Sequence, residues 1–219
     1  MRNVASVLIG LALLAGGASN GVVLGAGQAT SMVHTHIGHV MTKFQGTPNE
    51  QGLLPTALAE AKIAAQHAAL AAKTPDNLDA MKLHAGHIIH AVDPSVEMKG
   101  PGLGYGVKRA AAGAAQHIQL AAKVEGASKN VQTHSAHVAA SANNVVTRAD
   151  EIVALAQKIR AAISPADAAA LVSQLNMLAQ ELVAGMDANK DGRVTWEPTE
   201  GGLQQAQQHM ELLVKGEGL

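Results

Sequence analysis

An internal repeat of about 50 residues constrains the fold of this chain more than any other feature. The segments 64–73, "AAQHAALAAK", and 114–123, "AAQHIQLAAK", agree at eight of ten positions, and each carries one histidine, His67 or His117. A period of this length is typical of chains built from a repeated supersecondary unit, which buries its apolar face against its neighbours.

Pairs of histidines with the spacing H-x-x-H follow the same period. The second and third pairs are related by the same shift of 50 residues, and the first pair precedes the second by 48. Along the chain the order is therefore pair, single, pair, single, pair. The pairs are His36 and His39, His84 and His87, and His134 and His137.

Each repeat unit is predicted to contain two helices. Alanine has the highest helix propensity, and segments rich in Gly and Pro separate the alanine-rich stretches, at 45–55 and 93–106. Residues 131–162 contain neither Pro nor Gly and are consistent with one long helix, and 165–184 is a further helix with Ser164 as its N-cap. No long alternation of apolar and polar residues suggests a strand. The expected fold is an all-α helical bundle of duplicated two-helix units, followed by a C-terminal helix–loop–helix.

The first residues resemble an export signal. Arg2 provides a positive n-region, Val4 to Ala15 form an apolar h-region, and small residues at 27–29 suggest a cleavage site. We therefore expect a signal peptide at 1–29, a histidine-bearing repeat domain at 30–163 and a C-terminal helical hairpin at 164–219. The mature protein would be periplasmic or secreted, with no stable membrane insertion. The alternative is that the apolar segment stays as an uncleaved anchor.

Composition narrows the ligands and partners that the chain is expected to have. The net charge of −1 over 219 residues, with Lys and Arg scattered, does not favour a nucleic-acid partner. The chain has no cysteine, so disulfides, thiolate metal sites and thioether-linked haem are excluded. Any metal must be bound through histidine, carboxylate or carbonyl groups.

The repeated histidines predict transition-metal sites. Residues three apart share one helix face, so each pair presents two imidazoles side by side. In an antiparallel hairpin the single histidine would face the pair that follows, which predicts that His67 joins His84 and His87, and that His117 joins the third pair. Three imidazoles with a water or carboxylate suit Zn, Cu or Ni.

Other interpretations of the histidines remain open. Two histidines from facing helices bind b-type haem in many helical bundles, although this chain has only three aromatic residues to wall a haem pocket. Duplication alone also copies histidines, which would then be solvated surface residues. His34 precedes the first pair, and His90 extends the second. His209 lies outside the repeat, and we expect it to have no ligand role.

A calcium site is predicted near the C-terminus. The segment 187–198, "DANKDGRVTWEP", resembles the EF-hand calcium loop, with oxygen ligands at alternate positions and a glycine at the sharp turn. In place of the twelfth-position glutamate stands Pro198, so a neighbouring glutamate would have to complete the shell. The resemblance implies the ligand set Asp187, Asn189, Asp191, Arg193 (through its carbonyl), Thr195, Glu197 and Glu200.

These patterns together predict a metal-binding protein. No metalloprotease H-E-x-x-H, nucleophile elbow or phosphate-binding loop occurs in the chain, so we expect no enzymatic activity. The expected function is transition-metal sequestration or delivery, with one structural calcium. The alternatives are electron transfer through bis-histidine haem, and a calcium-stabilised structural protein whose histidines bind nothing.

Overall fold

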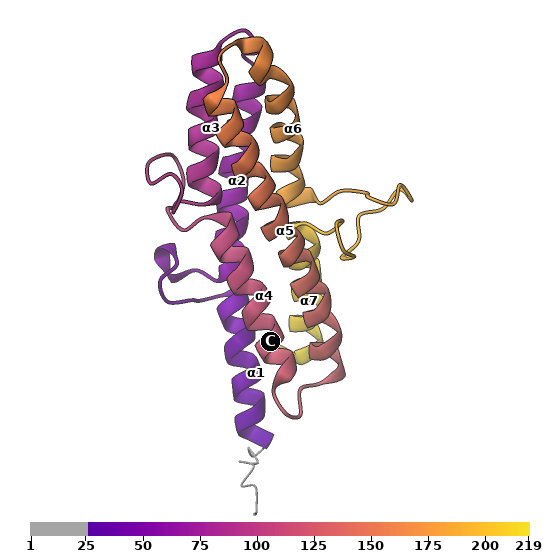
Figure 1. Cartoon of the computed structure of the whole chain (residues 1–219). Coiled ribbons are helices and arrows are strands. Elements are labelled where there is room, and N and C mark those ends of the chain that lie inside the picture. The colour runs from indigo at the N-terminus through magenta and orange to yellow at the C-terminus, as the bar shows by residue number, and fades with distance from the viewer. Residues whose placement is uncertain (1–25) are drawn as a thin grey trace, which may run out of the picture.

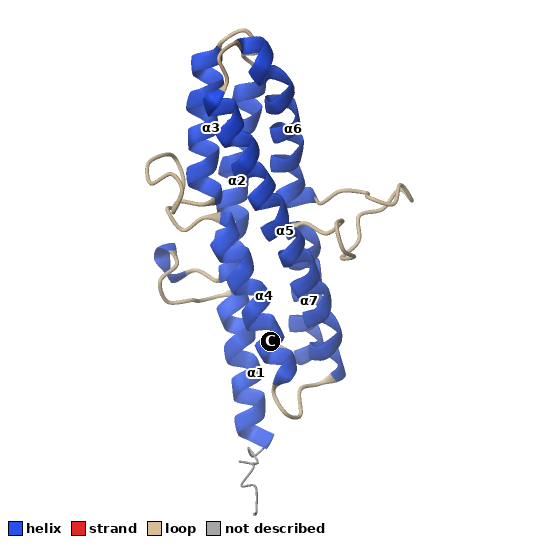
Figure 2. Ribbon diagram, viewed as in Figure 1, coloured by secondary structure: helices blue, strands red, loops and turns tan. Residues whose placement is uncertain are grey.

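The computed structural model describes residues 26–219, and this part of the chain is helical, with no β-strand (Figure 2). It contains seven α-helices and one short 3₁₀ turn, η1. In chain order these are α1 (Ala26–Met41), η1 (Pro48–Glu50), α2 (Leu53–Ala72), α3 (Leu78–Val92), α4 (Val107–Lys123), α5 (Lys129–Ala161), α6 (Pro165–Ala184) and α7 (Leu203–Glu217). The expected all-α bundle is confirmed.

The helices form four antiparallel rods (Figure 1). Rod A consists of α1 followed end to end by α2, rod B of α3 then α4, rod C of the single long helix α5, and rod D of α6 then α7. One half of the bundle packs α2, α3, α5 and α6 together, and the other half contains α1, α4, α5 and α7. We call these the upper and lower halves, as they appear in Figure 1. Loops interrupt rods A, B and D near mid-height and project sideways.

Each interrupted rod resumes at a glycine that touches the end of the preceding helix. Gly52 is the N-cap of α2, and a Cβ there would lie 2.4 Å from the carbonyl carbon of Met41 in α1. A Cβ on Gly202, the N-cap of α7, would lie 2.8 Å from the carbonyl oxygen of Val183 in α6. These approaches exclude any side chain, so the glycines allow the second helix to begin where the first one ends.

The C-terminal segment therefore differs from the predicted hairpin. Helices α6 and α7 flank a loop, but they follow each other along rod D instead of folding back on each other (Figure 1). The physical reason is the close contact between Gly185 and Gly202, which brings the two ends of the loop together. The loop is thus an excursion from one rod, and it starts and finishes at nearly the same place.

Alanine forms much of the core at the helix interfaces. In α4, Ala110, Ala111 and Ala114 are completely buried, and Ala64 and Ala68 of α2 are likewise inaccessible. Larger side chains such as Ile and Leu fill the remaining space between the rods. Because small side chains let helices approach closely, this core sets short distances between the outward-facing side chains of adjacent rods. None of the described helices is long and apolar enough to cross a membrane.

Candidate metal centres

Nine histidines form three groups of three, each between two antiparallel helices. Within a group the candidate ligand nitrogens all lie within 4.8 Å of one another. Every group combines an H-x-x-H pair from one helix with a single histidine from its neighbour. Triad 1 is His36 and His39 (α1) with His117 (α4), triad 2 is His84 and His87 (α3) with His67 (α2), and triad 3 is His134 and His137 (α5) with His209 (α7).

The three triads share the same internal geometry. In triad 1, Nδ1 of His117 lies 3.1 Å from Nδ1 of His36 and 3.2 Å from Nδ1 of His39. In triad 2, the single histidine's Nδ1 lies 3.0 and 3.4 Å from the Nδ1 atoms of its pair. In triad 3 the same distances are 3.1 and 3.4 Å. In each triad, the Nδ1 atoms of both pair members therefore face the Nδ1 of the single histidine.

These separations match those of nitrogens bound to one metal ion. With metal–nitrogen bonds of about 2.0–2.1 Å, two ligands of a tetrahedral ion lie about 3.3–3.4 Å apart, and two ligands at a right angle about 2.8–3.0 Å. Without a metal the triads are poorly satisfied, because a neutral imidazole Nδ1 has one proton or one lone pair. The Nδ1 of the single histidine faces two other Nδ1 atoms, but it can form a good hydrogen bond with only one of them.

Local sequence explains why the same geometry occurs three times. The three-residue step places both members of a pair on one face of a helix. Opposite the pairs of triads 1 and 2, the repeated AAQH segments bury their alanines and leave the histidine half-exposed: Ala64, Ala65, Ala114 and Ala115 are all buried. Triad 3 has no AAQH segment, but Ala206, three residues before His209, is buried in the same way. The alanines bring the facing helix close, and the histidine that follows them points along the groove between the two helices.

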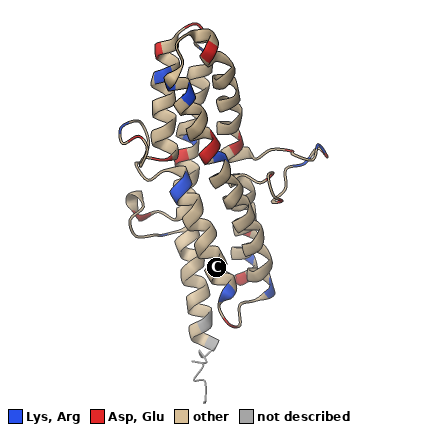
Figure 3. Ribbon diagram, viewed as in Figure 1, with Lys and Arg blue, Asp and Glu red and all other residues tan. Residues whose placement is uncertain are grey.

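The triad histidines are half-buried. Burial is the largest cause that lowers the pKa of His67 and His117, and repulsion between neighbouring imidazoles lowers it further. The same two effects lower the pKa of His209 to about 4. Helix α1 contains no Lys, Arg, Asp or Glu (Figure 3). In the described chain no carboxylate hydrogen-bonds to a triad histidine, and the lowered pKa values of His67, His117 and His209 favour the neutral form that binds a metal.

One of the two predicted groupings is correct. The structure brings His67 together with His84 and His87 across the α2–α3 turn. The grouping of His117 with the third pair is wrong, because His117 faces α1 and lies with His36 and His39. His209, for which we expected no ligand role, lies with His134 and His137 and supplies the third imidazole of triad 3.

Both errors arise from treating the mid-rod loops as breaks. Between the α2–α3 turn and His117 lie the 15 residues of α3 and the first part of α4, in which His117 is the eleventh residue. Between the same turn and His36 lie the 20 residues of α2 and the last part of α1, in which His36 is sixth from the end. Each therefore lies about 26 helical residues from the α2–α3 turn, and the two come level. In rods C and D, His209 lies level with His134 and His137 by the same count. Once the helices are known to continue along the same rods, counting helical residues accounts for all three triads.

Two other histidines stay outside the triads. His90 is buried, and its Nδ1 donates to the carbonyl oxygen of Glu97 at 2.9 Å. This bond ties the α3–α4 loop to α3, which is a structural role. His34 is half-exposed on α1 and belongs to no group of three potential ligands in residues 26–219.

The EF-hand-like loop is curled around its own oxygen atoms. The two carboxylate oxygens of Asp187 accept hydrogen bonds from the N–H groups of Asp191 (3.1 Å) and Gly192 (2.9 Å). Glu200 is buried, and one of its carboxylate oxygens accepts bonds from the N–H (2.9 Å) and hydroxyl (2.6 Å) of Thr195, which lower the pKa of Glu200. The side chain of Glu197 is exposed, so Glu200 is the glutamate that folds back over the loop.

Comparisons with protein-family models, with curated proteins and with solved structures found no significant match to this chain. Its function is therefore argued from the geometry of the triads.

Proposed function

We propose that the protein is an exported metal-binding protein that holds Zn²⁺, Cu²⁺ or Ni²⁺ at three tri-histidine sites, for sequestration or delivery. One observation carries the proposal: three separate pairs of helices present the same triad of converging Nδ1 atoms, at distances of 3.0–3.4 Å from the single histidine. Solvated surface histidines have no reason to converge in this way three times. Imidazole is a preferred ligand of these three metals.

The surroundings of the triads support binding rather than catalysis. Three protein ligands leave at least one position on the metal for water or an exchanging ligand. Among residues 26–219 no carboxylate belongs to a triad, and none hydrogen-bonds to an imidazole to strengthen it as a ligand. Such a site suits an ion that is bound and later released.

The geometry favours a metal ion over haem b. In bis-histidine haem the two axial nitrogens lie on opposite sides of the iron, about 4 Å apart with bonds of about 2.0 Å, and the flat macrocycle separates the two rings. Facing nitrogens 3.0 Å apart, such as those of His67 and His84, leave no space for a macrocycle between them. The third imidazole of each triad also has no role in axial ligation.

Export rests on the N-terminal sequence alone. Arg2 and the apolar run Val4 to Ala15 lie outside the described residues, and cleavage near Ala29 would leave all nine triad histidines in the mature chain. In the oxidising periplasm or outside the cell, a site made of histidines without cysteine would bind free metal ions.

A second proposal concerns calcium in the loop 187–200. Asp187, Asn189 and Asp191 have the sequence spacing of EF-hand ligands, and Glu200 stands close enough to Asp187 for the two charges to repel. A calcium ion among these oxygens would relieve the repulsion. Its role would be structural, since the loop links two halves of one rod.

Titration with Zn²⁺ and Cu²⁺, followed by calorimetry and elemental analysis, tests the transition-metal proposal. We expect three metal ions per chain, two in each of the variants His67→Ala, His117→Ala and His209→Ala, and none at comparable affinity in the triple variant. His34→Ala is the matched control and should still bind three. If the triple variant bound as many ions as the original protein, the triads would not be the sites.

A further inference from the structure

Aromatic rings distinguish the triads from one another. The chain contains only three residues of the Phe, Tyr and Trp types. The ring of Phe44 lies edge-on to His39 and His117 of triad 1, with centroids 5.4 and 5.1 Å apart. The ring of Trp196 stacks on His137 of triad 3 at 3.9 Å and 11°. The third aromatic residue, Tyr105, lies beneath the guanidinium of Arg109, so triad 2 has no aromatic ring against it.

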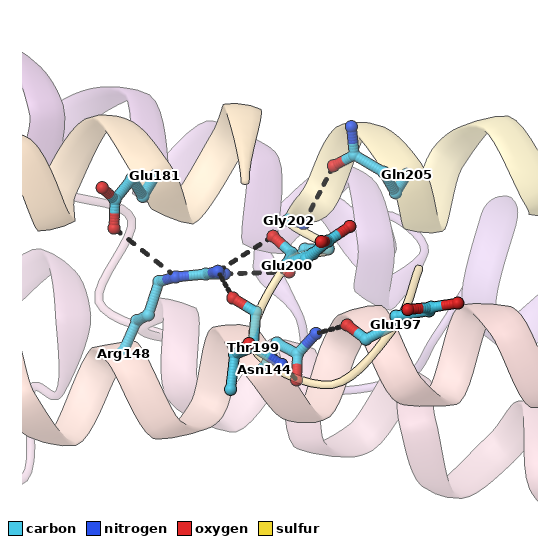
Figure 4. Close-up of polar contacts among 9 residues, drawn as sticks. Asn144, Arg148, Glu181, Glu197, Thr199, Glu200, Gly202 and Gln205 are labelled. Atoms are coloured by element: carbon cyan, nitrogen blue, oxygen red, sulfur yellow. Dashed lines mark hydrogen bonds and ion pairs between the residues drawn. The ribbon is translucent and has the colours of Figure 1, made fainter. Parts of the chain in front are cut away.

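The loop that carries Trp196 is hydrogen-bonded to α5, the helix that carries His137, through Asn144 and Arg148 (Figure 4). On α5, the side chain of Asn144 donates to the carbonyl of Glu197 at 2.8 Å and accepts from the N–H of Thr199 at 3.0 Å. One turn further, the Arg148 guanidinium donates to the carbonyl oxygens of three consecutive loop residues, Thr199, Glu200 and Gly201. The loop carrying Trp196 is therefore fixed to the same helix as the imidazole that Trp196 covers.

Phe44 is fixed by a smaller network inside its own loop. Its N–H donates to the carbonyl of Glu50 at 3.0 Å, and its carbonyl accepts from the buried hydroxyl of Thr47 at 2.7 Å. An isolated antiparallel β-bridge between the backbones of Lys43 and Gln51 closes the loop. Two different loops, α1–α2 and α6–α7, thus each deliver one ring to one triad.

Imidazole ligands must be held in the correct orientation to bind a metal tightly. Proteins normally achieve this with a hydrogen bond from the second ring nitrogen to a carboxylate or carbonyl. In residues 26–219 the triad imidazoles have hydrogen-bond contacts only with one another. Packing against a fixed aromatic ring is another means of restricting their rotation, and in residues 26–219 Phe44 and Trp196 provide it in triads 1 and 3 only.

We propose that Phe44 and Trp196 are positioning residues that pre-orient the imidazoles of triads 1 and 3, so that these two sites retain metal while triad 2 is the site of exchange. The inference rests on the proposed metal-binding function and adds an order of occupancy to it. Triads 1 and 3 fill first, and triad 2 is the first to give its ion to a competing chelate.

Three proteins that each keep one triad allow the sites to be compared. Substitution of the other two single histidines by alanine leaves triad 1, triad 2 or triad 3 alone. In competition with a chromophoric chelator we expect the Zn²⁺ affinity of triads 1 and 3 to exceed that of triad 2 by about tenfold, the lower end of the effect of losing an orienting partner. Equal affinities for the three sites would overturn the proposal.

Substitutions of the rings identify the cause. Phe44→Leu should weaken triad 1 about tenfold, and Trp196→Leu should weaken triad 3 about tenfold, while Trp196→Phe should restore most of the affinity of triad 3. Phe44→Leu in the triad-3 protein is the matched control and should change nothing, as should Tyr105→Leu in either background. A general loss of stability would weaken all backgrounds alike, and that result would contradict a positioning role.

The single tryptophan supplies an independent signal. Because Trp196 stacks on a ligand of triad 3, Cu²⁺ bound there should quench its fluorescence, whereas Cu²⁺ in the triad-2 protein should leave most of it. Quenching of equal depth in both proteins would overturn the placement of the ring. Absence of any metal binding in all three proteins would instead contradict the proposed function itself, so the two failures are distinguishable.

Discussion

The protonation state of the histidine side chains connects metal binding to the stability of the fold. Burial between helices lowers the pKa of the described triad residues His67, His84, His87 and His117 below the ordinary value of 6.5, and the pKa of His209 falls to about 4. A lowered pKa means that the folded protein binds a proton less readily than the unfolded chain does. The neutral form that ligates metal is thus also the form that the fold favours.

Stability of the metal-free protein should therefore fall as the solution becomes acidic. Well above pH 6.5 these five histidines of lowered pKa are neutral in both the folded and the unfolded state, so they do not change the stability. Between pH 6.5 and about 4 the unfolded chain takes up protons that the folded chain does not, so the free energy of unfolding decreases as pH falls. Thermal melts across this range should show the decrease, and His209→Ala should make it shallower. A melting temperature that is constant from pH 6.5 to 4.5 would contradict the assignment.

At the scale of helices and loops, the mid-rod loops are the features that sequence patterns describe least well. Gly and Pro mark where they occur, and helix propensity and the caps of α5 and α6 are readable from residues such as Ser164. Whether a helix folds back after such a loop or resumes along the same axis depends on contacts between distant residues. Two contacts determine that the helices resume along the same axis: Gly52 lies against Met41, and Arg148 donates to the carbonyl of Gly201. Neither contact has a local sequence signal. The spacing of the histidines was readable, but their partners were not.

Calcium should stabilise the α6–α7 loop if the ligand assignment is correct. An ion that binds only the folded state stabilises it by mass action, by about 2.7 kcal/mol at a hundredfold excess over its dissociation constant. We expect Ca²⁺ to raise the melting temperature, and Asp187→Ala with Asp191→Ala to abolish that rise. Asp167→Ala is a control, since Asp167 lies at the start of α6 away from the loop. If Ca²⁺ leaves the original protein unchanged, the loop is a metal-free turn.

At the scale of the whole molecule, metal bound at the triads would cross-link the rods. Rods A and B are joined at both ends, by triad 2 in the upper half and triad 1 in the lower half, whereas rods C and D are joined only in the lower half, by triad 3. Helix α6 contains no histidine, and those of α5 lie in its first three turns. The duplication of the histidine-bearing unit therefore accounts for the A–B pair, and the C–D pair retains half of the same plan.

Helix α1 should respond most strongly to metal among the elements of the bundle. It packs mainly on α4, with a smaller contact to the start of α2, so triad 1 is a large part of what holds it. Because exchange of backbone amides requires local opening, Zn²⁺ bound to His36, His39 and His117 should slow hydrogen exchange along α1 more than along α5. His117→Ala should remove this protection. His209→Ala removes a metal site of the same kind but should leave the protection of α1 intact. Equal slowing of α1 in both variants would show that metal stabilises the bundle as a whole and that triad 1 does not anchor α1 to α4.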